Sequence, residues 1–179
     1  DDLQSVSLAL VAAPGSTVEV DDVSVERLSS DVPEGLGSVS WQTAGLRLTL
    51  GPDGRLREFV DLATGTNYAD SRAPSVFRAF RNGQELPAHY VQMVDGRLEV
   101  HFADAEVVAW LEVEERPESL VWTVDEVRGE GVEWVGLCDL RLSLSGTVGT
   151  LVNAAWDDRF AACVLACNDR THSFGAEEG

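Results

Sequence analysis

The sequence contains no lysine, only three cysteines, one methionine and no long apolar run. Without roughly 18 consecutive apolar residues, no transmembrane helix is expected. Three cysteines are too few for a disulfide framework, and a chain of 179 residues can bury a core without one. The apolar fraction of 44% and the charged fraction of 25% exclude wholesale disorder, collagen and coiled coil. The chain is therefore expected to be globular, as one domain or one domain plus a piece of another.

Positive charge is scarce. Aspartate and glutamate total 31 against 13 basic residues, all of them arginine, which gives a net charge of −18. A surface of this kind repels nucleic-acid phosphates and anionic membranes, so no nucleic-acid partner and no membrane partner is expected. A GC-rich genome or a saline habitat would produce the same composition. The charge thus excludes partners without naming a function.

Period-two alternation of apolar and polar residues dominates the chain, whereas a 3.6-residue period is nearly absent. The alternation is found at 46–50, 98–102, 107–113 and 140–144, and Val- and Trp-rich strands are expected at 120–127 and 132–138. Residues 159–167 permit a short helix but are interpreted as a strand. Strands at roughly 8–12-residue spacing indicate an all-β fold, an antiparallel sandwich or barrel.

Turn residues lie between these runs. Asp95-Gly96, between two alternating segments, is a strong β-hairpin signal. Pro52-Asp53-Gly54 and Gly129-Glu130-Gly131 predict further turns.

The composition changes at 29–38, SSDVPEGLGS, which is rich in Ser, Pro and Gly and is interpreted as a linker. It separates a short piece, 1–28, from a larger unit, 39–179. Two strands are expected in the short piece, too few to bury a core alone. Because the chain opens on Asp1-Asp2, it is expected to be a processed product or a fragment.

The short piece carries a family resemblance. Its run PGSTVEVDDVSVERL resembles the closing strand of secreted jelly-roll carbohydrate-binding modules. The resemblance implies a structural calcium with Asp22 and Asp21 as candidate ligands, and carboxylate oxygens suit that ion. The alternative is that both residues cap a turn or face water.

The larger unit carries a second resemblance. Residues 45–68, GLRLTLGPDGRLREFVDLATGTNY, resemble the opening hairpin of galactose-mutarotase-like super-sandwich domains, and the later strands fit the same pattern. Such domains precede catalytic barrels in glycoside hydrolases and related polysaccharide-active enzymes, which implies a secreted or extracellular protein. The epimerases of this superfamily use a His acid and a Glu base. Here His89, His101 and His172 lack that family's surroundings, although His101 shares the polar face of its strand with Glu99.

The best candidate for a ligand site is a glycan-binding loop that contains Asn153, Trp156, Asp157, Asp158 and Arg159. Aromatic faces pack on the C–H surfaces of sugars, and planar polar side chains bridge their hydroxyl groups. The alternative is structural, with Trp156 in the core and an aspartate paired with Arg159 at a turn.

Two other groups of residues have structural interpretations. Cys138, Cys163 and Cys167 lie in apolar segments and are expected to be small buried residues, although a zinc site with His172 is conceivable. Trp110 lies inside a strand and is expected to pack in the core or between the sheets.

Paired carboxylates for glycoside hydrolysis must face each other across a cleft. Asp157 and Asp158 are neighbours and point to opposite faces of a strand, so they make a poor pair. The sequence therefore predicts a non-catalytic accessory region of an extracellular carbohydrate-active enzyme, whose parent is a glycoside hydrolase or polysaccharide lyase. Its expected partners are a polysaccharide or glycan and a neighbouring catalytic domain of the same chain. The alternatives are a structural or adhesion sandwich without a sugar partner, and an enzyme active within this segment.

Overall fold

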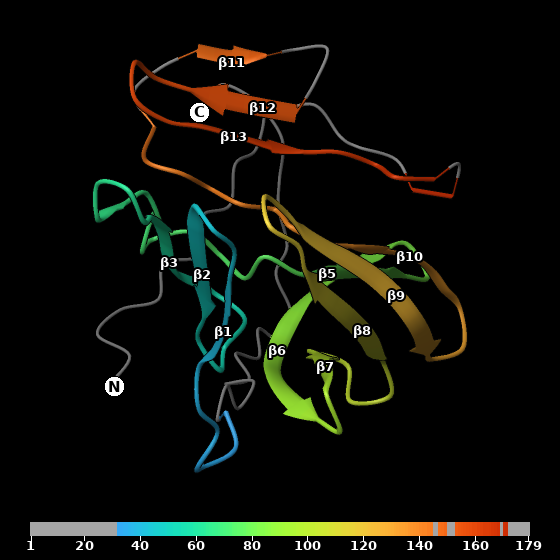
Figure 1. Ribbon diagram of the computed structural model, residues 1–179. Coiled ribbons are helices and arrows are strands. Elements are labelled where there is room, and N and C mark those ends of the chain that lie inside the picture. The colour runs from blue at the N-terminus through green and yellow to red at the C-terminus, as the bar shows by residue number, and fades with distance from the viewer. Residues whose placement is uncertain (1–31, 145–146, 150–152, 169, 172–179) are drawn as a thin grey trace, which may run out of the picture. The chain divides into compact units, whose positions relative to one another are not determined.

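The computed structural model describes residues 32–144, 147–149, 153–168 and 170–171, all within the unit Asp31–Gly179. This part of the chain is all-β, and its three sheets are antiparallel, as the alternation predicts (Figure 1). Residues 1–28, with Asp21 and Asp22, and also His172 lie outside the described residues, so the predictions made for them stay predictions.

The first sheet has four strands in sequential order. They are β1 (Val39–Gln42), β2 (Leu46–Leu50), β3 (Leu56–Asp61) and β4 (Thr66–Asn67). Leu48 and Leu50 are buried, whereas Thr49 between them is half-exposed, so one face of the sheet belongs to the core.

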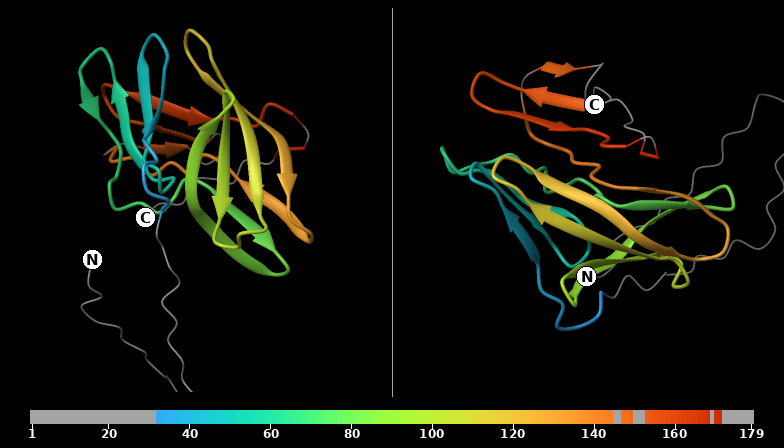
Figure 2. Two further views of the ribbon diagram at one scale, coloured as in Figure 1. Left: turned by 90° about the horizontal axis from the view of Figure 1, so that it is seen from below. Right: turned by 45° about the vertical axis from the view of Figure 1, so that its right-hand side comes forward.

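The second sheet has six strands in the order β10-β5-β6-β7-β8-β9. They are β5 (Arg78–Arg81), β6 (Gln84–Val94), β7 (Arg97–Phe102), β8 (Val108–Glu115), β9 (Leu120–Arg128) and β10 (Val132–Gly136). The two outermost strands, β9 and β10, are consecutive in the chain and line one shallow cavity together. The sheet is therefore curled into a nearly closed, barrel-like form, which the views in Figure 2 help to follow.

The third sheet consists of β11 (Thr147–Gly149), β12 (Asn153–Trp156) and β13 (Ala161–Val164). The segment 159–167 thus contains a strand, as predicted, although the strand is shorter than expected. The alternating run 140–144 forms no strand and makes only an isolated bridge between Leu142 and Ala69. Leu140, Leu142 and Leu144 still pack on the core. The alternation of this run reflects burial of its leucines on one side. The run is not a strand, because no neighbouring segment forms a full hydrogen-bonded ladder with it.

One hydrophobic core joins the first two sheets. Leu50 from β2 and Val91, Val100 and Leu111 from the six-stranded sheet are almost completely buried within it. Trp122 of β9 packs edge-on against Trp41 of β1, with ring centroids 5.0 Å apart. The two sheets therefore enclose a shared core, as in sandwiches.

The turn between β6 and β7 has the predicted chemistry. Asp95 has φ of 50° and Gly96 has φ of 81°. Two-residue hairpins favour positive φ at both central positions, because that backbone twist matches the twist of the flanking strands. The hairpin prediction at Asp95-Gly96 is confirmed.

The prediction of three buried cysteines is wrong for two of them. Cys163 and Cys167 are exposed, and Cys138 is half-buried. Cys163 lies on β13 beside Ala162, which packs towards the core, so alternation turns Cys163 outward. Burial raises the pKa of the Cys138 thiol to about 12.

Candidate functional site

The predicted glycan-binding residues lie on the β12–β13 hairpin. Strand pairing joins Trp156 to Ala161 at the turn and Asn153 to Val164 at the far end. Trp156, Asp157, Asp158 and Arg159 are therefore brought together at one turn. Asn153 lies three residues before Trp156, roughly 10 Å along the strand and on the opposite face, so it does not join them.

Asp157 organises this turn. Its Oδ1 accepts hydrogen bonds from the backbone N–H groups of Arg159 at 2.8 Å and Phe160 at 2.9 Å. The Asp157 backbone N–H donates in turn to the Phe160 carbonyl at 2.9 Å. The two backbone donors hold the pKa of Asp157 below its usual range. One Asp157 oxygen is therefore committed to the fold.

The side chains next to Asp157 are open to solvent. Trp156 is 40% exposed, and Asp158 and Arg159 are exposed as well. Within the described part of the chain, the Arg159 guanidinium has no carboxylate within salt-bridge distance. The turn thus presents an indole, a carboxylate and a guanidinium together.

Phe160 anchors this turn to the first sheet. Its ring stacks on Tyr68, with centroids 4.8 Å apart, and meets Phe59 edge-on at 6.0 Å. Tyr68 is buried, and burial raises the pKa of its phenol, with a further contribution from the charge of Asp157. The position of the turn is therefore fixed by aromatic packing.

The motif D-x-x-T-G-x-N-Y at 61–68 positions Tyr68, on which Phe160 packs. Asp61 accepts hydrogen bonds from the Ala63 N–H at 3.0 Å and the Thr64 hydroxyl at 2.6 Å. Gly65 adopts φ of 74°, which an L side chain rarely adopts. These contacts shape the β3–β4 turn that leads into Tyr68.

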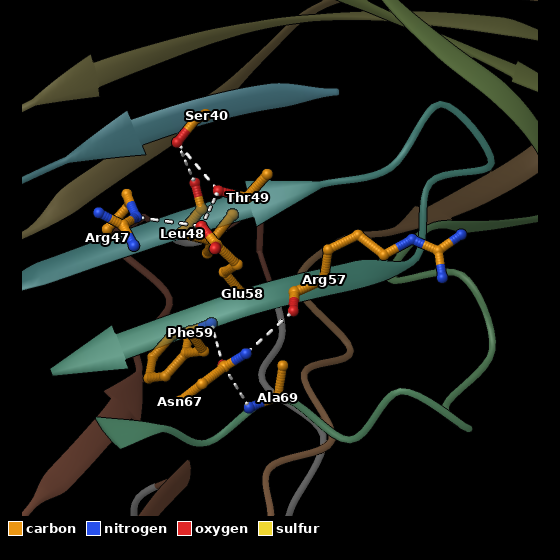
Figure 3. A network of polar contacts seen from close by, with 9 residues as sticks. All are labelled: Ser40, Arg47, Leu48, Thr49, Arg57, Glu58, Phe59, Asn67 and Ala69. Carbon is orange, nitrogen blue, oxygen red and sulfur yellow. Dashed lines mark hydrogen bonds and ion pairs between the residues drawn. The ribbon is translucent and has the colours of Figure 1, made fainter. Parts of the chain in front are cut away.

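Asn67 from the same motif holds the sheet edge together (Figure 3). Its Oδ1 accepts from the backbone N–H groups of Phe59 at 2.9 Å and Ala69 at 3.0 Å. Its amide nitrogen donates to the Arg57 carbonyl at 3.2 Å. Within the motif that carries the family resemblance, the Asn67 side chain thus has a structural role, because it hydrogen-bonds backbone groups.

The outer face of the first sheet carries a second polar group, also drawn in Figure 3. Glu58 Oε2 accepts from the Thr49 hydroxyl at 2.9 Å and from Arg47 Nε at 3.0 Å. The Thr49 hydroxyl also lies 3.0 Å from the Ser40 hydroxyl. The hydrogen bond from Thr49, followed by that from Arg47, lowers the pKa of Glu58. These cross-strand contacts stabilise β1, β2 and β3.

A polar cluster surrounds Glu99 on the outer face of the second sheet. The sequence indicated only that Glu99 and His101 share this face. Glu99 Oε1 accepts from the Trp110 indole N–H at 2.7 Å. Glu99 Oε2 accepts from the Gln92 amide at 2.7 Å and lies 3.2 Å from His101 Nε2. Desolvation raises the pKa of Glu99, but the three hydrogen bonds outweigh it and lower the pKa overall. Glu99 and His101 share a face, as their alternation indicates, but the contribution of Trp110 needed the strand register.

Aromatic and cationic groups surround this cluster. Tyr90 stacks on His101 with centroids 4.1 Å apart, and the Arg128 guanidinium lies 4.7 Å from the centre of the Trp110 ring. Trp110 is only 8% exposed, so its predicted burial is confirmed, although it lies opposite Glu99 and outside the main core cluster. Both Glu99 oxygens are hydrogen-bonded, so these contacts stabilise the outer face of the second sheet.

His89 forms a β-bulge beside this cluster. Its Nε2 is buried and has no hydrogen-bond partner within the described part of the chain. The ring meets Tyr90 edge-on at 5.6 Å. A bulge redirects a side chain out of the regular alternation, so the strand pattern did not reveal its surroundings.

Among the described residues, no group of three or more His, Cys, Asp or Glu side chains is arranged to hold a metal ion. The candidate calcium ligands Asp21 and Asp22 lie outside this part. The described chain also contains no long apolar helix of the kind that spans a bilayer.

Comparisons with known proteins add no relative. No family model matches the chain, and no curated protein or solved structure matches it.

Proposed function

We propose that the chain is a non-catalytic β-sandwich accessory region of an extracellular carbohydrate-active enzyme and that it binds glycan at the β12–β13 hairpin. The observation that carries the proposal is the 40% exposed Trp156 indole beside the exposed Asp158 and Arg159 on an anchored turn. The proposal includes a super-sandwich-like fold for 39–179 and jelly-roll strands in 1–28. It rests there on the sequence resemblances.

The anchoring of the turn favours binding. Holding Phe160 against Tyr68 and tying Asp157 to two backbone N–H groups orders the turn before any ligand arrives. Ordering a binding loop in advance removes part of the entropic cost of association. The indole face would lie against sugar C–H groups, while Asp158 and Arg159 would reach hydroxyl groups.

A supporting rather than catalytic role agrees with the carboxylates of this hairpin. Asp157 is partly committed to the turn, and Asp158 is its sequence neighbour. Glycoside hydrolysis needs two carboxyl groups across a bond, roughly 5–9.5 Å apart. The proposal therefore assigns catalysis to a neighbouring domain of the same chain, with a polysaccharide as the shared partner.

The alternative is a structural or adhesion module that binds no sugar. It is favoured by the structural use of Asp157 and of the Asp61–Tyr68 motif. The two functions differ in one measurable property, which is the retention of the protein by polysaccharides.

The test is affinity electrophoresis of the full chain through gels that contain neutral or acidic polysaccharides. Trp156→Ala is compared with wild type and with Trp134→Ala, a matched control because Trp134 is 37% exposed on another sheet. We expect at least one polysaccharide to retard wild type and Trp134→Ala, and the retardation to be lost in Trp156→Ala. Equal loss in both variants would show that the site is not specific to the Trp156 turn. No retardation in any gel would refute glycan binding.

A further inference from the structure

An open seam lies between β9 and β10, the two outermost strands of the curled sheet. We define the β9–β10 seam by the apolar side chains that line its cavity of about 290 Å³, namely Val124, Val127, Val132, Trp134 and Val135. The turn through Gly129 to Gly131 joins the two strands. Even so, β9 pairs only with β8 and β10 only with β5, and no described strand pairs with their other edges.

The apolar residues of the seam belong to the core side of the sheet. Val124 pairs with Leu111 and Val127 pairs with Ala109, and both partners are completely buried. The two valines are nevertheless each 39% exposed. Earlier on the same side of β9, Trp122 is covered by Trp41 and Phe77. The core surface therefore continues past Trp122 into a region that the described residues leave open.

Two features together identify what would fill this opening. A free strand edge offers backbone N–H and C=O groups that another extended backbone pairs with, and the valines offer a surface for alternate side chains. A small apolar ligand would cover the valines but leave the backbone edge unpaired. The geometry therefore favours an added β-strand.

Charge narrows the choice of strand. Glu133 lines the cavity, and the stretch from β9 into the following turn carries Asp125, Glu126 and Glu130 with Arg128 as its basic residue. Arg81 also reaches this turn through the Glu130 carbonyl, but it is already paired with Asp104 and Glu106. Arg97 pairs with Asp125 at 2.8 Å, and Arg128 lies 3.6 Å from Glu126, which leaves the rim acidic. Antiparallel pairing of two β9 strands about Asp125 and Glu126 would place these carboxylates of two copies opposite each other, which is destabilising. The basic side chains of an added strand would instead be attracted to these acidic side chains.

We propose that the β9–β10 seam binds an extended segment of a partner polypeptide in which apolar and basic side chains alternate. The backbone of this segment pairs with the free edge of β9. Its apolar side chains cover Val124 and Val127, and its basic side chains face the acidic rim. This inference is independent of the glycan site, because the third sheet contributes no residue to the seam.

The test uses the full chain and a labelled nine-residue peptide of alternating valine and arginine, followed by fluorescence anisotropy. One comparison peptide has glutamate in place of arginine. Another keeps the arginines but replaces valines by proline, which removes backbone donors at equal charge. We expect only the valine–arginine peptide to bind, more weakly at high salt, and to slow hydrogen exchange of β9 amides.

Protein variants locate the binding. Val124→Ser with Val127→Ser removes the apolar surface without adding charge and should weaken binding by about tenfold or more. Val94→Ser is the matched control, because Val94 is 37% exposed and lines no part of the seam cavity, and it should bind like wild type. Circular dichroism establishes that each variant is folded.

Several results would overturn the proposal. They are the absence of binding to the valine–arginine peptide, equal binding of the proline peptide, and unchanged binding by the folded Val124→Ser/Val127→Ser variant. Self-association in sedimentation, lost in that double variant, would instead identify a second copy of the chain as the occupant.

Discussion

Replacing Glu99 by Gln tests the polar cluster on the outer face of the second sheet. In wild type one carboxylate accepts from Trp110, Gln92 and His101. The glutamine oxygen can keep the bond to Trp110. The NH2 group of the new glutamine then takes the place of the oxygen that accepts from Gln92, so two donor groups face each other. Glu99→Gln should therefore lose the charge-assisted contact with Gln92, while the His101 ring can keep a weaker, neutral contact by accepting from the new amide in its other tautomer.

The expected magnitude follows from the type of contact. A hydrogen bond to a charged group contributes about 1.5–3 kcal/mol and a neutral one about 0.5–1.5 kcal/mol. Because Gln92 and His101 are only partly buried, water restores some of what they lose. We expect Glu99→Gln to lower the free energy of unfolding by about 2 kcal/mol at pH 7. Urea denaturation followed by tryptophan fluorescence measures this difference.

The pH dependence gives a sharper check. The pKa of Glu99 is lowered on folding from an ordinary value of 4.5, so the carboxylate stabilises the folded state above that pH. The stabilisation is lost as the pH falls through the folded pKa. The difference between wild type and Glu99→Gln should thus be full at pH 7 and should shrink below pH of about 4.5.

A matched control separates this effect from general acid denaturation. Glu112→Gln changes an exposed carboxylate on the neighbouring strand β8, and it should leave the free energy of unfolding at pH 7 unchanged. Repeating the comparison in a His101→Asn background removes the contact between that ring and Glu99. A Glu99→Gln difference that stays constant from pH 7 to 3.5, or that grows as pH falls, would refute the assignment.

Two further predictions concern stability and reactivity. Asn67→Ala leaves the Phe59 and Ala69 N–H groups without their acceptor, so urea unfolding should show a loss of about 1–3 kcal/mol. Asn67→Asp keeps the acceptor and should cost less, and an Ala variant as stable as wild type would contradict this. Cys163 and Cys167 are exposed, whereas burial raises the pKa of Cys138 to about 12. A thiol reagent at pH 8 should therefore modify two cysteines promptly and Cys138 only after unfolding, as followed by mass spectrometry. Equal rates for all three would show that Cys138 is accessible.

The local features of the fold could be predicted from sequence. Alternation located β7 and β8, because successive side chains of a strand point to opposite faces. Asp95-Gly96 located a hairpin, because few other residue pairs accept positive φ at both positions. The same reasoning overestimated 140–144, where alternating leucines reach the core from a chain without a strand ladder.

The candidate sites were predicted less completely. The 153–159 segment was located from its residue types, and four of its five residues do meet at one turn. The commitment of Asp157 to backbone donors was not visible, and neither was the anchoring of Phe160 by Tyr68, which is 92 positions earlier in the chain. Contacts of this kind depend on which sheets pack together.

The sequence by itself determined the all-β class, most strand positions and several turns, because these follow from backbone preferences and the period of side-chain burial. Only the tertiary structure decided that β10 pairs with β5 although a short turn joins it to β9. Only that structure joined Glu99 to Trp110 through the register of β7 and β8. Strand partners and register are decided by packing across the whole core, so no short stretch of sequence contains them.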